Sequence, residues 1–260
     1  MQLMDTLRKC AGWCPMAAAA QQNKQDTSSL VPQAKAADAG PVAERARLFS
    51  KLTLAIVGIA WIAAIAALPF LPDFIPVHWN IYGDADGFAP RLIGTFSLPV
   101  IMTIVAAILV ILPRIDSMRV SFDNSRDIYA IVIFATACLL LGLELTTFVS
   151  SAGMDLPVAV VLNILLGTFF MVIGGLMPYI RRNTTIGFRL PWTIRSEWVW
   201  DETHRHGGSV FIIAGILIVL VSIAGGKGAM PLAFGILAVA IVYITAWSYR
   251  LAQAETGRSG

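Results

Sequence analysis

The chain has 260 residues, of which 57% are hydrophobic and only 13% are charged. A soluble globular domain carries about 25% charged residues, so lipid rather than water is the expected solvent for most of this chain. The net charge of +3 is too small to indicate a protein that binds nucleic acid directly. Composition therefore predicts an integral membrane protein.

Residues 1–45 are polar and show no sustained hydrophobic period, which predicts a disordered tail. A cleaved signal peptide is not expected, because the apolar patch near the N-terminus is short and interrupted by glycine and proline. The tail holds Cys10 and Cys14, whereas Cys138 lies in an apolar run. Three cysteines without repeated spacing predict reduced thiols and no disulfide framework.

Six apolar runs follow the tail, and five of them have the roughly 17–25 residues that a membrane-spanning helix needs. The runs are continuous, without the alternation of a membrane β-barrel, so they predict helices. The fifth is short enough that we expect it either to extend backwards over Gly208 and Ser209 or to lie where the bilayer is thinner. The runs are Leu52–Leu71, Ile93–Leu112, Ile128–Val149, Leu156–Ile180, Val210–Gly225 and Met230–Tyr249. The predicted fold is an all-α, polytopic transmembrane helical bundle of about six spans.

The lysines and arginines predict the orientation of these spans. Six spans place both termini, and the loops after the second and fourth spans, on one side of the membrane. That side holds seventeen of the nineteen basic residues, and only Arg91 and Lys227 fall on the other side. Because positive charge accumulates on the cytoplasmic side, we expect both termini to be cytoplasmic in a multi-pass protein of the cell membrane.

The predicted organisation has four parts. Residues 1–45 form the cytoplasmic tail, and residues 46–127 carry the first two spans with a loop on the outer side. Residues 128–250 carry four spans with an arginine- and tryptophan-rich inner loop at 181–208. Residues 251–260 form a C-terminal tail.

The outer loop is unusually rich in residues that carry chemistry or shape turns. Glycine and aspartate favour tight turns, and aromatic rings suit the membrane interface. Two interpretations stay open, namely a structured turn at the interface and a ligand or metal site built from His78, Asp84 and Asp86. The spacing of these three residues is weak for a metal ion. The candidate residues are Pro76, His78, Trp79, Asn80, Gly83, Asp84, Asp86 and Gly87.

Glu144 is the only acidic or basic side chain well inside any of the apolar runs. Such a residue is costly in lipid and usually faces the interior of the helical bundle or a water-filled cavity. One interpretation is a carboxyl group that couples protons or contacts a ligand. The other is a structural hydrogen bond to Asn163 in the fourth span, or to Thr146 or Thr147 nearby.

The inner loop combines five arginines with three tryptophans, which suits the level of the lipid headgroups. Ser196 followed by Glu197 predicts the N-cap of a short helix. On that helix a spacing of three and four residues would place four side chains on one face. They are Glu197, Trp200, Asp201 and His204. A metal site that uses His204 and His206 near Asp201 is a weaker alternative.

The spacing Asn183-x3-Gly187-x-Arg189-x-Pro191-Trp192-Thr193-x2-Ser196-x3-Trp200-x3-His204 resembles the signature of the SdpI immunity-protein family. The outer loop, Pro76-x-His78-Trp79-Asn80-x2-Gly83-x2-Asp86-Gly87, is similar to an uncharacterised module found upstream in that family. The two patterns cover roughly residues 50–250 in the expected order. Leu190 departs from the family, which often has threonine there, and the family core lacks the long N-terminal tail.

The resemblance implies a prokaryotic protein of the cytoplasmic membrane and implies no catalytic residues. The sequence shows no nucleophile, metal or phosphate-binding constellation, so we expect a non-enzymatic protein without cofactor or metal. The resemblance also implies protection against a secreted peptide toxin that attacks the membrane, and retention of a cytoplasmic transcriptional repressor at the membrane. The alternative, which depends on Glu144, is a small proton-coupled transporter or a membrane enzyme. A repeated, inverted arrangement of spans, which would favour a transporter, is not detectable in the sequence.

Overall fold

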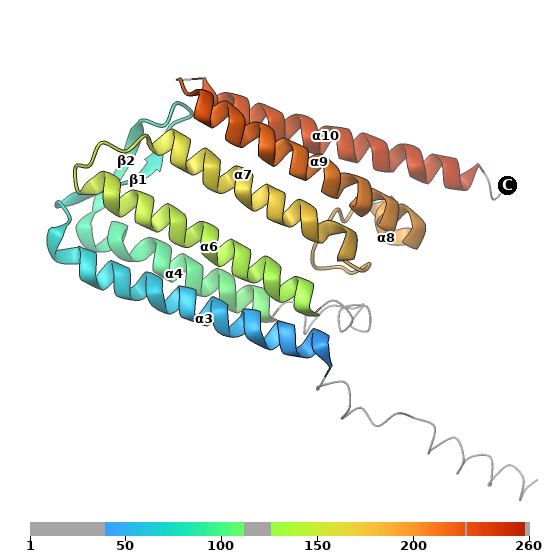
Figure 1. Ribbon diagram of the computed structural model, residues 1–260, viewed down its shortest axis with the longest axis horizontal. Helices are drawn as coiled ribbons and strands as arrows, with labels where there is room; N and C mark the ends of the chain where they lie inside the picture. The colour runs from blue at the N-terminus through green and yellow to red at the C-terminus, as the bar shows by residue number, and fades with distance from the viewer. Residues whose placement is uncertain (1–39, 112–125, 227, 258–260) are drawn as a thin grey trace, which may run out of the picture. The chain divides into compact units, whose positions relative to one another are not determined.

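The computed structural model describes residues 40–111, 126–226 and 228–257, and most of these residues are helical (Figure 1). Six of the helices are long and apolar enough to cross a membrane. They are α3 (Pro41–Ala67), α4 (Arg91–Ile111), α6 (Arg126–Ser151), α7 (Val158–Leu176), α9 (Glu197–Ala224) and α10 (Ala229–Thr256). The predicted all-α, polytopic class is therefore confirmed.

The first helix begins at Pro41, within the segment predicted to be a polar tail. Proline is tolerated in the first turn of a helix, because the N–H group that it lacks would have no hydrogen-bond partner within the helix there. Glu44, also in the first turn, complements the positive end of the helix dipole. Short 3-10 turns at Leu68–Phe70 and Met177–Tyr179 end the first and fourth spans. The segment that contains Cys10 and Cys14 lies outside the described residues.

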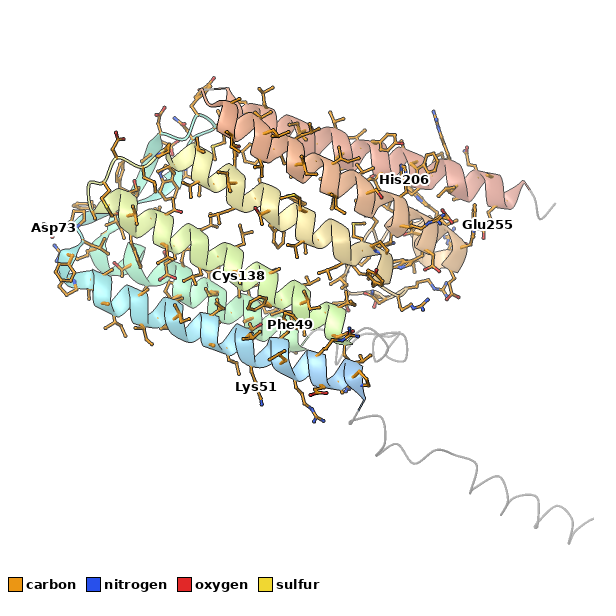
Figure 2. All side chains as sticks on the ribbon, viewed as in Figure 1. Phe49, Lys51, Asp73, Cys138, His206 and Glu255 are labelled. Atoms are coloured by element: carbon orange, nitrogen blue, oxygen red, sulfur yellow. The ribbon has the colours of Figure 1, made fainter. Side chains whose placement is uncertain are left out.

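Within residues 44–260, the long helices run alongside one another, with a β-hairpin at one end and the short helix α8 (Pro191–Arg195) at the other (Figure 1). Figure 2 shows Asp73 at the hairpin end and Glu255 at the opposite end. The larger buried core lies at the α8 end and includes Trp200, Phe211 and Ile244. A smaller core joins Ile75 of the hairpin to Phe148 of α6.

The outer loop forms two antiparallel strands, β1 (Phe74–Trp79) and β2 (Ala85–Pro90), which the all-α prediction did not include. The Asn80 side-chain oxygen accepts hydrogen bonds from the backbone N–H groups of Tyr82 and Asp84, at 2.8 and 3.1 Å. Gly83 has a φ of +85°, which L-residues with a side chain rarely adopt. The turn is therefore set by these two residues of the predicted motif.

The helix expected to begin at Glu197 is not a short, separate element. It continues without interruption through the fifth apolar run to Ala224, as helix α9. Its predicted N-cap is confirmed, because the Ser196 hydroxyl accepts the N–H of Val199 at 3.2 Å. The predicted common face is divided, since Trp200 and His204 are buried whereas Glu197 and Asp201 are exposed.

Helices α7 and α9 approach each other closely through glycines. A Cβ atom at Gly215 would lie 2.5 Å from the carbonyl oxygen of Gly167, and one at Gly167 would lie 2.7 Å from the carbonyl oxygen of Gly215. Gly174 and Gly208 form a second reciprocal pair, at 2.6 and 2.5 Å. Small residues let helices pack backbone against backbone in lipid, where burial of apolar surface supplies little driving force.

Candidate functional site

The hairpin presents the residues of the outer motif in three different environments. Pro76 is buried beneath the sheet, and Trp79 and Asn80 are half-buried. His78 is largely exposed, and its Nδ1 atom lies 2.5 Å from a carboxylate oxygen of Asp86 across the hairpin. Gly87 lies opposite His78, where a Cβ atom would be only 2.8 Å from that of His78.

The base of the hairpin is held by Arg91, one of the two basic residues expected on the outer side. Its guanidinium forms an ion pair with Asp73, and its Nε donates to the Pro72 carbonyl at 3.2 Å. The hairpin also exposes aromatic side chains, since Phe74, Tyr82 and Phe88 are all more than half exposed. Of the three residues considered for a ligand or metal site, His78 and Asp86 form a pair, whereas Asp84 is exposed at the turn.

A cavity of about 320 Å³ lies beneath the hairpin. Strand β1 forms one wall through His78 and Trp79, and helix α4 forms another. Leu143 and Thr147 of α6 and Leu162 of α7 line it from the other side. The cavity therefore lies between the outer motif and the turn of α6 that contains Leu143 and Thr147.

Glu144 is completely buried, and neither of its carboxyl oxygens has a hydrogen-bond partner among the described residues. The predicted structural hydrogen bonds are absent there. Thr146 and Thr147 donate to the carbonyls of Gly142 and Leu143 on their own helix. Asn163 is also buried, and its Nδ2 atom has no partner.

The residues of the inner motif form a compact lock around His204. The ring Nε2 accepts the backbone N–H of Phe188 at 3.0 Å, and Nδ1 donates to the Trp200 carbonyl at 2.8 Å. A neutral imidazole with its proton on Nδ1 satisfies both bonds. The position beside Phe188 must be glycine, because Gly187 has a φ of +103° and a Cβ atom there would lie 2.3 Å from Nε2. Both ring nitrogens are thus engaged, which leaves no lone pair for the metal site considered from the sequence.

The rest of the motif fixes the loop on either side of this lock. The Asn183 side-chain oxygen accepts the N–H groups of Thr185 and Ile186 at 2.7 and 2.8 Å. The Arg189 guanidinium donates to the Thr184 carbonyl at 2.7 Å. Pro191 begins helix α8, as expected for proline at a first helical position.

Two further motif residues tie the loop together at its core. The Thr193 hydroxyl donates to the Phe188 carbonyl at 2.5 Å and accepts the N–H of Leu190 at 2.9 Å. Trp200 is fully buried, donates from Nε1 to the Ile180 carbonyl at 2.8 Å, and stacks on His204 with ring centroids 4.1 Å apart. The structure therefore gives these motif residues a role in shaping the loop.

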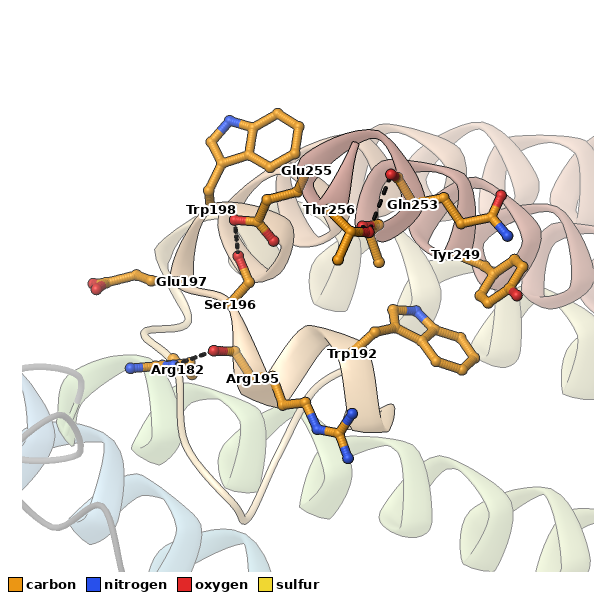
Figure 3. Close-up of a pocket in the computed structure, with 11 residues that line it drawn as sticks. Arg182, Trp192, Arg195, Ser196, Glu197, Trp198, Tyr249, Gln253, Glu255 and Thr256 are labelled. Carbon is orange, nitrogen blue, oxygen red and sulfur yellow. Dashed lines mark hydrogen bonds between the residues drawn. The ribbon is translucent and has the colours of Figure 1, made fainter. Parts of the chain in front are cut away.

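The loop is also joined to the end of α10, which the sequence did not indicate. Trp192 Nε1 donates to the Ser248 hydroxyl at 2.9 Å. The Ser196 hydroxyl donates to a Glu255 carboxylate oxygen at 2.6 Å, as Figure 3 shows. Between these contacts lies an open hollow of about 730 Å³. Arg182, Arg195, Glu197 and aromatic rings line it, so it offers both charges and apolar surface.

Comparison with known proteins matches two parts of the chain to family models. Residues 179–248, which include the inner loop, match the SdpI/YfhL protein family. Residues 55–103, which include the hairpin, match a domain of unknown function, DUF1648. The resemblance predicted from the two motifs is therefore confirmed.

The chain is also 24% identical to the immunity protein SdpI of Bacillus subtilis (strain 168) over 201 residues. The match covers 76% of this chain and 93% of that protein. No solved structure matches. The six apolar helices and this similarity identify a multi-pass membrane protein.

Proposed function

We propose that this chain, whose inner-loop region is of the SdpI/YfhL family, is a non-enzymatic membrane protein that protects a prokaryotic cell from a membrane-active peptide. The observation that carries the proposal is similarity along nearly the whole length of an immunity protein, 93% of it, with both motifs in order. Similarity of this extent takes in most of this chain as well, 76% of it.

The two ends of the molecule suit different parts of this role. The hairpin offers exposed aromatic side chains, Phe74, Tyr82 and Phe88, to an amphipathic peptide at the membrane surface. The hollow beside α8 offers arginines and tryptophans to a cytoplasmic partner, for which a transcriptional repressor is our candidate. Peptide binding at one end and signalling at the other are both part of the proposal.

The proposal predicts that expression of the protein protects sensitive cells from killing by membrane-active peptides. We expect the double variant Phe74→Ser, Phe88→Ser to lose most of this protection at unchanged protein abundance, because the apolar contact surface is removed. Survival across a series of peptide concentrations measures the effect. Tyr179→Ser is the matched control, since Tyr179 is equally exposed, at 65%, but lies next to the inner loop.

Equal killing of cells with and without the protein, for every peptide tried, would contradict the immunity proposal. Glu144 supports a second candidate, a small proton-coupled transporter, because both of its carboxyl oxygens lack partners among the residues that the structure describes. Movement of a substrate driven by a proton gradient, lost in Glu144→Gln, would favour that candidate.

The distribution of basic residues further leads us to propose that both termini and the 181–208 loop are cytoplasmic. In a protein whose native cysteines are replaced, a membrane-impermeant thiol reagent applied to intact cells should label a cysteine at Ala85 in the hairpin. It should label a cysteine at Thr184 only after the membrane is opened. Labelling of the Thr184 variant in intact cells would reverse the proposed orientation.

A further inference from the structure

A second cavity, of about 390 Å³, lies between three of the spanning helices, α3, α4 and α6. Direct contacts of α3 bracket it. Phe49 meets Phe134 of α6 with ring centroids 5.5 Å apart, and Trp61 Nε1 donates to the Thr103 hydroxyl of α4 at 3.0 Å. The α3 residues that line the cavity all lie between Phe49 and Trp61 in sequence. Small side chains face it from the other two helices, namely Ala106, Ala107 and Ala130.

The lining of this cavity is aliphatic in its chemistry. Three hydroxyl groups line it, those of Ser50, Thr53 and Thr103. Each of them donates to a carbonyl of its own helix, at 2.8, 2.9 and 2.8 Å respectively. All the other lining residues have aliphatic side chains. Because the hydroxyl protons are already engaged, the cavity suits an aliphatic group rather than a polar one.

The cavity also borders the surface that faces the membrane. Leu54, which lines it, is 72% exposed, and Ala107 on α4 is exposed as well. Because α3 and α4 are spanning helices, lipid surrounds these exposed side chains. The lining residues of α3 extend from Ser50 to Val57, which is about 10 Å along the helix. This length fits within the roughly 15 Å that one leaflet contributes to the hydrocarbon core, so an acyl chain can enter from the side.

Basic side chains flank the cavity on the exposed side of α3. Arg47 and Lys51 are both exposed, and Figure 2 shows the Lys51 side chain directed away from the bundle. Arg47, Lys51 and Leu54 follow one another at spacings of four and three residues, so they lie on one side of the helix. The only acid on α3, Glu44, lies one turn before Arg47. An excess of positive charge beside an aliphatic cavity matches a lipid with an anionic headgroup.

We propose that the cavity between α3, α4 and α6 binds one acyl chain of an anionic phospholipid, whose phosphate is held by Arg47 and Lys51. The chain fills space that the three helices leave unpacked, and it gains dispersion contacts with their aliphatic side chains. The phosphate accepts charge-assisted hydrogen bonds from the two basic residues. The lipid therefore joins α3 to its neighbours between the levels of its two direct contacts. This site is independent of the proposed function.

The site can be tested with phosphatidylglycerol as the probe and phosphatidylcholine with the same chains as its counterpart without net charge. In the full-length protein in detergent, phosphatidylglycerol should raise the midpoint of thermal unfolding by about 2 °C or more above the effect of phosphatidylcholine, because it binds the folded state. Lys51→Gln should reduce this difference by at least half. Arg250→Gln is the matched control, since it removes an exposed basic side chain from α10 and should leave the difference intact.

The cavity itself is tested by Ala107→Phe, whose ring would occupy it and should remove most of the rise produced by phosphatidylglycerol. Ala238→Phe makes the same change at an exposed position of α10 and should leave the rise intact. Glycerol phosphate, which has the phosphate but no acyl chain, should produce no rise.

Three results would overturn the site. The first is an equal effect of the two lipids on the unaltered protein. The second is an equal rise with glycerol phosphate, which would mean that no acyl chain is bound. The third is an undiminished rise in Ala107→Phe. If Ala107→Phe does not fold, Lys51→Gln decides, because an undiminished difference between the two lipids in that surface variant contradicts the proposed phosphate contact.

Discussion

Gly215→Ala should lower the free energy of unfolding by about 1–3 kcal/mol, the usual cost of forcing extra atoms into a packed interior. The added methyl group would lie 2.5 Å from the Gly167 carbonyl oxygen and 2.7 Å from Met171 Cγ. The carbonyl belongs to helix backbone and cannot turn aside, so α7 and α9 must separate. The midpoint of thermal unfolding in detergent, and the folded fraction after purification, measure the loss.

Gly235→Ala supplies the matched control for this prediction. Gly235 lies in the spanning helix α10 and has nothing within 4 Å of the position of a Cβ atom. The same methyl group should therefore be neutral or slightly stabilising, because alanine favours helix by about 1 kcal/mol over glycine. Equal midpoints for the two variants would show that the close approach of α7 and α9 does not limit stability.

The spacing of the glycines on α7 and α9 is visible in the sequence, but the sequence does not show which helices these glycines bring together. Gly167 and Gly174 are seven residues apart, and so are Gly208 and Gly215. This spacing repeats one face of a helix and is typical of close packing in membranes. Which two helices meet, and in which register, depends on tertiary packing. The apolar runs predict the six helices, because length and hydropathy depend only on local sequence.

The ends of the spans were harder to predict than their centres. Helix α9 begins thirteen residues before the apolar run at Val210. This polar stretch is helical because one side of it, which carries Trp200 and His204, is buried. The hairpin was missed because its strands contain proline and glycine and do not alternate cleanly between polar and apolar residues. Gly83 was predicted correctly to favour a tight turn, whereas Asn80, whose side chain accepts the N–H of Tyr82 in that turn, was named only as part of the motif.

The sequence motifs identified which residues form the candidate sites, but not which contacts each residue makes. Gly187 and His204 are separated by sixteen residues that include a loop and helix α8, so no helical or strand period relates them. Glu144 stood out because a lone acid in an apolar run is conspicuous. Its lack of partners depends on where the threonines nearby direct their hydroxyl groups, which sequence spacing does not specify.

The second large effect is expected in the variant Gly187→Ala, which disturbs the hydrogen bonds of His204 that hold the inner loop closed. At a φ of +103° a residue with a side chain is strained, which costs about 1–3 kcal/mol. The new methyl group would also lie 2.3 Å from His204 Nε2, and His204 is held in turn by its stacking on Trp200. The expected result is release of the Phe188 N–H from His204 and opening of the loop. The spans should remain folded, because their packing does not pass through Gly187.

Trypsin cleavage in inside-out membrane vesicles distinguishes opening of the loop from general unfolding. Arg189 and Arg195 are exposed cleavage sites within the loop. Where closing is faster than cleavage, the cleavage rate follows the population of the open form, so the variant should be cut there at least about ten times faster. Gly175→Ala is the matched control, because nothing lies within 4 Å of a Cβ atom at Gly175. Cleavage of Gly187→Ala at the rate of the unaltered protein would mean that His204 does not hold the loop closed.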